Sequence, residues 1–356
     1  MSDPGGTMKT PGREEVANGG ARRGGPPSAR AARDGGSPEE GRDRAGGARV
    51  GEEAAQREAD YPADEPAGSE PVGTSRQFRS PLFFAQQAAR YERQELIRQY
   101  EALFGCRLAV MIDAIFDESV TYFEELVFDA DPAQDMHLML ASPGGYGEAA
   151  VRIVRAAQAR CGRLTVVVPE IAKSAATILA LGAHRILMGP ASDLGPVDPQ
   201  FPMPDGSLVS AKDMVAAVDR ALNDIAKRPD TYPLHSGLLA DVNALIVQQA
   251  RSAIDRTADL VEEALRSNPD RKPATVEKLV EKLSAPLIHG PKSHEAIFGY
   301  PEAKKAGLPV ERCDPTSEQW QRIWLLWTRY YTLSPIPYGP TRIYEGAFAS
   351  QIFQGR

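Results

Sequence analysis

The order of apolar and polar positions predicts a regular alternation of strands and helices in the first half of the folded chain. Short apolar runs predict strands over 107–114, 136–142, 163–169 and 184–189. Apolar residues at helical spacing predict helices over 83–104, 117–130, 146–162 and 174–183. Apolar strands that alternate with amphipathic helices are typical of parallel β-α-β units, so we expect an α/β fold.

The second half of the chain has a mainly helical pattern. Residues 210–284 are expected to be helical, and a later helix is expected to end at Gly307, before one more strand. Trp320, Trp324 and Trp327 follow at spacings that place them on one face of a late helix. Such a face favours packing in the core or at a subunit interface over a surface that stacks a ligand.

The N-terminal segment has a different composition from the rest. Residues 1–77 contain no Leu, Ile, Phe or Trp and are rich in Gly, Pro, Arg and Glu. Such a segment cannot bury enough apolar surface to offset its ordering entropy, so we expect a disordered tail. The sequence therefore predicts three parts: the tail over 1–77, a folded domain over 78–310 that begins with a helix, and an aromatic-rich helix and tail over 311–356.

Charge and cysteine content narrow the class of protein. The net charge is −7 with acidic and basic residues interspersed, which argues against nucleic acid as a partner. The three cysteines are far apart in the sequence, which fits a reducing compartment without a disulfide framework or a zinc site. No apolar run reaches the length of a membrane span. We expect a cytoplasmic protein with no integral membrane segment, no metal and no cofactor.

Two short loops carry the candidate chemistry, because both follow predicted parallel strands, where open α/β sheets place their sites. In "ASPGGYGEAA", Gly144 and Gly145 can turn bare backbone N–H groups toward a cavity that suits a developing oxyanion. In "PEIAKSAAT", Ser174 stands between small residues at the start of a helix, and the N–H of Ala175 would face the same cavity. Ser174 is either a helix cap or a nucleophile; the two loops together supply the parts that acyl transfer needs.

The combination of these motifs resembles a known family. "SPGG", a serine flanked by small residues about thirty positions later, and "LGAHRILMGPASDLGPVDPQ" are similar to the Clp-fold serine peptidases, above all to the serine dehydrogenase proteinase family, relatives of signal peptide peptidase A. The resemblance covers 108–310. It implies a Clp/crotonase-like spiral of β-α-β units with added helices, serine endopeptidase activity on protein or peptide substrates, and a homo-oligomer.

The catalytic base is less clear from the sequence. The loop that holds a histidine in the ring-forming Clp proteases reads "SDLGPVDPQ" here and contains none. Asp198 in that loop could orient a base, but a carboxylate is poorly matched to removing a serine proton. His184, at the far end of the serine's helix, is expected to be structural, and Lys173 is expected to line the cleft.

Lysine-dyad relatives place their base at a helix start about forty residues after the serine, and Lys212 matches that place. We therefore expect a Ser174–Lys212 dyad, with His294 and Asp198 as reserve candidates and Gly144, Gly145 and Ala175 as oxyanion donors. Two other functions stay open at this point. The crotonase fold also hosts acyl-CoA hydratases and isomerases, which need no serine nucleophile, and a non-catalytic oligomeric scaffold could share the fold.

Overall fold

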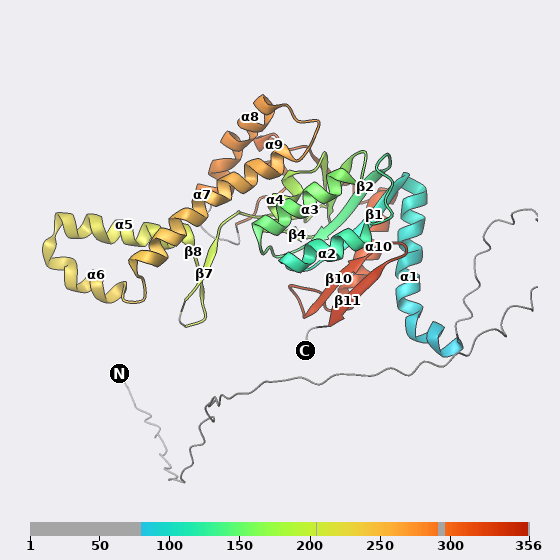
Figure 1. The fold of residues 1–356 in the computed structure, drawn as a ribbon, viewed down its shortest axis with the longest axis horizontal. Helices are drawn as coiled ribbons and strands as arrows, with labels where there is room; N and C mark the ends of the chain where they lie inside the picture. Colours follow the sequence, from blue (N-terminus) through green and yellow to red (C-terminus); the bar gives the residue numbers. More distant parts are fainter. Residues whose placement is uncertain (1–79, 204, 291–295, 355–356) are drawn as a thin grey trace, which may run out of the picture. The chain divides into compact units, whose positions relative to one another are not determined.

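The computed structural model describes residues 80–203, 205–290 and 296–354. Its central element is a seven-stranded sheet with the spatial order β11 (Ser350–Gln354), β10 (Thr341–Glu345), β1 (Cys106–Ile112), β2 (Asp135–Ala141), β3 (Leu164–Val168), β5 (Arg185–Met188) and β9 (Val310–Arg312). The five strands from β1 to β9 run parallel, whereas β10 is antiparallel to β1 and β11 to β10. The expected α/β class is confirmed (Figure 1).

Both faces of the parallel strands are buried, which explains their nearly continuous apolar sequences. On β1, Ala109 and Met111 belong to one core cluster, and Val110 and Ile112 belong to a second cluster on the opposite face. Each fully buried side chain of this size contributes roughly 1.5–3 kcal/mol relative to exposure. The sheet is therefore the middle layer between two hydrophobic cores.

Helices on each face complete these two cores. The first cluster takes residues from α2 (Asp117–Leu126), α3 (Gly147–Ala159), α4 (Ala175–Leu181), α7 (Ala244–Arg266), α8 (Pro273–Leu283) and α9 (Tyr300–Ala306). The second cluster takes residues from α1 (Pro81–Phe104) and α10 (Glu318–Tyr331). Ser80 caps the start of α1, since its hydroxyl accepts a bond from the Phe83 N–H, and Gly105, in the left-handed conformation, follows its last residue.

Shorter elements connect this sheet to the long helices. Two-residue strands β4 (Ile171–Ala172) and β6 (Asp193–Leu194) pair in parallel, and β7 (Gln200–Pro202) forms a hairpin with β8 (Leu208–Ser210). The hairpin leads into α5 (Ala211–Lys227), which packs along α7. A 3₁₀ turn (Pro229–Thr231) and α6 (Tyr232–Leu238) then lead toward α7, and a π-helical segment (Ser284–His289) follows α8.

The C-terminal part differs from the expected helix and tail over 311–356. α10 is present, but β10 and β11 follow it and extend the main sheet, so the described C-terminal residues belong to the same folded unit as the sheet. Trp320 and Trp327 are buried in the second core, as expected, whereas Trp324 is largely exposed. The expected tail over 1–77 lies outside the described residues.

Candidate active site

Two loops meet at the carboxyl ends of β2 and β3. The loop after β2 contains Ser142, whose N–H donates to the Ile171 carbonyl (3.0 Å) and whose carbonyl accepts from the Lys173 N–H (3.0 Å). These bonds form a parallel bridge between Ser142 and Ala172. The backbone therefore holds the glycine loop beside the segment that leads to Ser174.

Ser174 lies at the junction between β4 and α4 in a conformation that is rare for serine. Its backbone has φ 51° and ψ −117°, in the positive-φ region where a side chain is strained. The hydroxyl makes no capping bond to the helix, so the interpretation of Ser174 as a cap is wrong. A half-exposed serine on a sharp strand-to-helix turn is the arrangement that presents a nucleophile in other hydrolases.

Gly144 and Gly145 both have positive φ, at 116° and 140°. A Cβ on Gly144 would come within 2.6 Å of the Ser174 Cβ, and a Cβ on Gly145 would come within 2.1 Å of the Ile115 carbonyl oxygen. Only glycine fits either position. The loop is thus packed directly against Ser174 on one side and against the backbone of Ile115 on the other.

The backbone bonds of this loop fix the direction of its N–H groups. The Ile115 N–H donates to the Gly144 carbonyl (2.7 Å), and the Tyr146 N–H donates to the Ile115 carbonyl (2.7 Å). In such a parallel bridge the central residue, Gly145, directs its own N–H away from Ile115. The Gly145 N–H is therefore not used in the bridge to Ile115.

The backbone N–H groups of the three expected oxyanion donors differ in whether they already have a hydrogen-bond acceptor. The Gly144 N–H donates to Ser142 Oγ (3.1 Å), so it is engaged within its own loop, and its role as an oxyanion donor stays a prediction. Within the described residues, neither the Gly145 N–H nor the Ala175 N–H has a protein acceptor. Ala175 is the first residue of α4, where N–H groups lack helical partners and the helix dipole favours negative charge.

Lys173 does not line an open cleft, contrary to expectation. Its ammonium forms a buried ion pair with Asp193 on β6, and the other oxygen of Asp193 accepts a bond from the Phe298 N–H (2.7 Å). The lysine stem crosses Gly195 so closely that a Cβ there would come within 2.5 Å of Lys173 Cδ. This ion pair anchors the backbone immediately before the serine.

Thr177 is a second anchor, which the sequence analysis missed. Its hydroxyl accepts a bond from the Gly195 N–H (3.0 Å) and lies 2.8 Å from the Ala172 carbonyl oxygen. The first turn of α4 is thus tied to the loop after β6. The only signal in the sequence was one small polar residue within an apolar helix.

Lys212 is the second residue of α5 and is half-buried. Ser210 caps this helix through a bond from the Asp213 N–H (3.4 Å), and its hydroxyl donates to the buried Asp198 carboxylate (2.9 Å). The Ala211 N–H donates to the Pro199 carbonyl (2.8 Å). The start of α5 is therefore held against the segment that follows β6.

Within the described residues, no hydrogen bond joins Ser174 Oγ to Lys212 Nζ, so the dyad stays a prediction. His294, the reserve base, lies outside the described residues. His184 is structural, as expected: its Nδ1 accepts a bond from the Leu164 N–H (3.0 Å), and burial lowers its pKa.

A cavity of about 530 Å³ lies at the carboxyl ends of β3, β5 and β9. Asp193 contributes to its wall, together with Glu170, Glu302 and Arg312, so the lining carries both signs of charge. Among the described residues, no cluster of three His, Cys, Asp or Glu side chains is arranged to hold a metal ion. None of the described helices combines the length and the apolar character that crossing a membrane requires.

Comparison with known proteins agrees with this geometry. The chain belongs to the ClpP-like SDH-type serine proteinase family, which it matches over residues 127–321. The family expected from the sequence is thereby confirmed, and it favours a serine peptidase over an acyl-CoA enzyme or a scaffold.

Two relatives are uncharacterized proteins of Methanocaldococcus jannaschii. One is 32% identical over 174 residues, which cover 49% of this chain and 52% of the relative, so the match spans about half of that protein's length. The other is 22% identical over 236 residues, with 62% of this chain and 71% of the relative covered.

Two solved structures are similar. The 1510-N membrane-bound stomatin-specific protease, in a substituted form, has a TM-score of 0.38 and 17% identity over 60% of this chain and 82% of its own. A variant of ClpP1 from Listeria monocytogenes has a TM-score of 0.35 and 12% identity over 61% of this chain and 96% of its own.

Proposed function

We propose that this chain is a serine endopeptidase that cleaves protein or peptide substrates through an acyl-enzyme on Ser174. The observation that carries the proposal is the strained backbone of Ser174 (φ 51°, ψ −117°). Its hydroxyl makes no capping bond to the helix, and its side chain lies against Gly144. Strain of this kind persists only where the surrounding structure imposes it, and it clusters at catalytic positions. Membership of the serine proteinase family supports the same conclusion.

In the proposed mechanism, Ser174 Oγ attacks the scissile carbonyl carbon while the neutral amine of Lys212 accepts the hydroxyl proton. The Gly145 and Ala175 N–H groups donate to the resulting oxyanion, and each such donor lowers the barrier by about 3 kcal/mol. Collapse of the tetrahedral intermediate breaks the C–N bond, and the leaving amine takes the proton from Lys212. Water then attacks the ester carbonyl while Lys212 accepts one of its protons; collapse of the second tetrahedral intermediate breaks the bond to Ser174 Oγ, Lys212 returns the proton to that oxygen, and the carboxylic acid product leaves.

The assignment of Lys212 rests on the anchoring of α5. Ser210 caps this helix and donates to Asp198, and these bonds hold its first turn in place. Lys212 also stands at a helix start about forty residues after the serine, where lysine-dyad relatives place their base. We therefore assign Lys212 as the base.

Hydrolysis of a fluorogenic peptide or of casein tests the proposal. Ser174→Ala and Lys212→Met should each abolish hydrolysis, and Lys227→Met, at the far end of α5, should not. Activity that survives in Ser174→Ala would contradict the peptidase assignment. If Lys212→Met keeps activity and Ser174→Ala does not, Ser174 remains the nucleophile and His294 replaces Lys212 as the proposed base.

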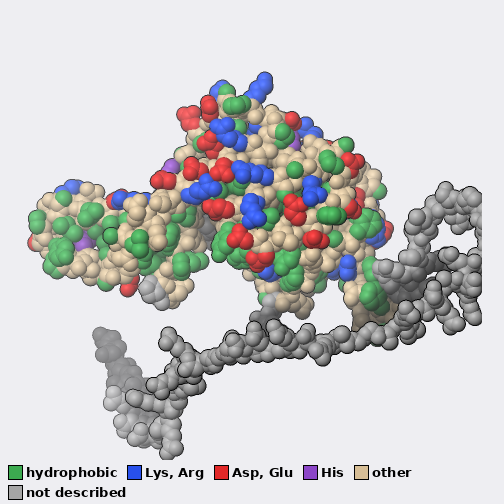
Figure 2. Space-filling view, in the orientation of Figure 1, with side chains coloured by type: hydrophobic (Ala, Val, Ile, Leu, Met, Phe, Trp, Pro, Cys, Tyr) green, Lys and Arg blue, Asp and Glu red, His purple; other side chains and the backbone are tan. Residues whose placement is uncertain are grey.

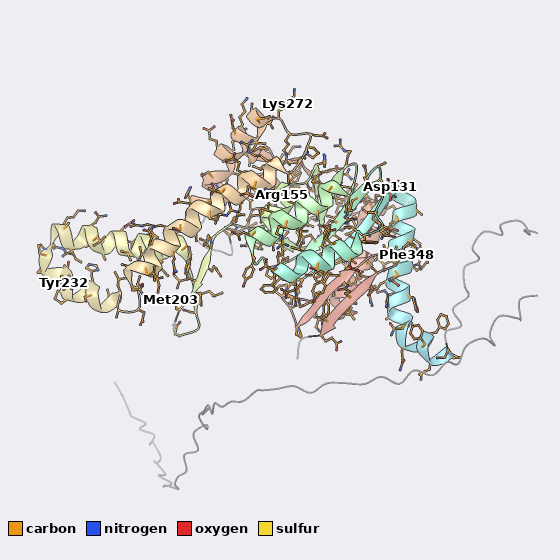
Figure 3. The ribbon with its side chains drawn as sticks, viewed as in Figure 1. Asp131, Arg155, Met203, Tyr232, Lys272 and Phe348 are labelled. Carbon is orange, nitrogen blue, oxygen red and sulfur yellow. The ribbon has the colours of Figure 1, made fainter. Side chains whose placement is uncertain are left out.

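We further propose that the chain forms a homo-oligomer. Large apolar side chains are exposed on α5, on α6 and at the start of α7: Leu222, Tyr232, Leu234, Leu238 and Leu245 are 60–71% exposed. Figure 2 shows hydrophobic side chains on this part of the molecule, and Figure 3 labels Tyr232 there. Burial of such a surface between subunits is favourable. A monomer mass in light scattering at micromolar concentration would contradict the proposal.

A further inference from the structure

Asp113 is a buried carboxylate just beyond the carboxyl end of β1, and it lies next to the segment that holds the glycine loop. Its side chain is fully buried, and its N–H donates to the Ala141 carbonyl (3.2 Å) at the end of β2. Two residues later, Ile115 makes both backbone bonds to the loop, through the Gly144 carbonyl and the Tyr146 N–H. The position of Asp113 therefore bears directly on the position of the glycines.

Two side chains from the C-terminal strand β10 hold this carboxylate. Asp113 Oδ2 accepts bonds from Arg342 Nε (2.7 Å) and from the Tyr344 hydroxyl (2.6 Å). Burial raises the pKa of Asp113, and these two bonds oppose that shift. A buried carboxylate is costly unless it is paired, so each donor is needed to keep the carboxylate in this place.

The same side chains also hold the residue that follows Ile115. Tyr344 Oη lies 2.8 Å from Ser119 Oγ, and Ser119 Oγ accepts a bond from the Phe116 N–H (3.0 Å). The guanidinium of Arg342 lies over the Phe116 ring, 5.6 Å from its centroid, and that ring packs edge-on against Tyr146 (5.5 Å). The segment around Ile115 is thus fixed on both sides, at Asp113 and at Phe116.

We propose that Asp113, Arg342 and Tyr344 form a positioning clamp that holds the Gly144–Gly145 loop in the geometry required of the oxyanion donor. The inference rests on the proposed peptidase function, because it concerns the same loop. Arg342 and Tyr344 touch no substrate atom in this account; they act through Asp113 and Ile115.

All three clamp residues lie outside the 127–321 segment that matches the family. The clamp is therefore built from residues on either side of that segment, just beyond β1 and on β10. It gives β10 a role in catalysis, although this strand follows the nucleophile by more than 160 residues.

A second cluster on β10 supplies a matched control. Glu345 is also fully buried, and it accepts bonds from Arg93 Nε (2.7 Å) and from the Tyr330 hydroxyl (2.8 Å). This cluster has the same chemistry but lies in the core that α1 and α10 cover, on the opposite face of the sheet from Tyr344. Tyr330→Phe and Tyr344→Phe each remove one phenol–carboxylate bond from the same strand.

The test compares these two variants in the full chain by peptide hydrolysis and by hydrogen exchange. Tyr344→Phe should lower kcat about tenfold with KM changed less than about twofold, since a misplaced donor affects the transition state most. Tyr330→Phe should keep kcat within about twofold of the wild type, even where both variants melt at a lower temperature. Active-site titration corrects each kcat for any unfolded fraction.

Hydrogen exchange gives a readout that does not depend on activity. The amides of Ile115 and Tyr146 should exchange about tenfold faster in Tyr344→Phe than in the wild type. In Tyr330→Phe their exchange rates should equal those of the wild type. Equal exchange in both variants, or equal loss of kcat, would overturn the clamp. If the wild type shows no hydrolysis but the Tyr344→Phe variant still exchanges these amides faster, the proposed function is overturned and the clamp stands.

Discussion

Gly144 lies against Ser174, and a Cβ at position 144 would come within 2.6 Å of the serine Cβ and 3.2 Å of its hydroxyl oxygen. Ser174 and the loop are therefore in close packing, with no room for a side chain at position 144. Because Gly144 also has φ 116°, an added side chain would be strained even if Ser174 yielded.

Gly144→Ala should accordingly remove most of the hydrolytic activity. A displacement of the nucleophile by about 1 Å costs on the order of 10²-fold in rate, and we expect a loss of at least that size in kcat. Gly206→Ala is the control, because Gly206 also has positive φ but nothing within 4 Å of its added Cβ. A Gly144→Ala enzyme as active as Gly206→Ala would contradict the close packing.

Lys173 and the proposed base Lys212 should respond differently to substitution. Lys173→Met leaves the buried Asp193 without its cation, and breaking a buried pair in this way costs about 3–5 kcal/mol of unfolding free energy. Lys212→Met, at a half-buried helix start, should change stability by less than about 1 kcal/mol and yet abolish hydrolysis. Urea unfolding followed by circular dichroism measures the first effect. Equal stability of the two variants would show that the Lys173–Asp193 pair does not carry this energy.

The buried His137 should make the fold sensitive to mild acid. Burial lowers the pKa of His137 to about 4, and its Nδ1 lies 2.8 Å from the Tyr100 hydroxyl. Between pH 6.5 and pH 4 the unfolded chain binds a proton at this histidine that the folded chain does not bind, so stability falls as pH falls. The unfolding free energy falls by about 3 kcal/mol in total through this histidine; it is undiminished above pH 6.5 and falls as pH drops toward 4.

Urea midpoints at pH 7 and pH 5 measure this effect, with His137→Gln as the comparison. Glutamine does not titrate, so the variant should lose less stability than the wild type over the same interval. The same pH slope in both proteins would show that another group causes the acid sensitivity.

The parallel part of the fold could be predicted from the sequence because its signals are local. The runs that form β1, β2, β3 and β5 are apolar on both faces, and the helices between them have clear periodicity. β10 gave no such signal, since Arg342 and Glu345 interrupt its apolar pattern. Glu345 is buried and Arg342 half-buried, and each is paired with a residue more than 200 positions away in the chain, Arg93 and Asp113, which no local pattern reveals.

The candidate site shows the same division. Gly144 and Gly145 could be predicted because their positive φ requires glycine, whereas Ser174 was singled out by the small residues around it at a predicted strand-to-helix junction. The pairing of Lys173 with Asp193 was missed because it depends on how two loops fold over each other. The engagement of the Gly144 N–H by Ser142 depends on a side-chain rotamer, which no sequence pattern specifies.

An activated serine nucleophile reacts with a fluorophosphonate probe, so labelling reports directly on Ser174. We expect one label per chain on the peptide that contains Ser174, loss of the label in Ser174→Ala, and loss of hydrolysis in step with labelling. If the wild-type protein hydrolyses peptides while Ser174 stays unmodified, or if the label is on another serine, Ser174 is not the nucleophile.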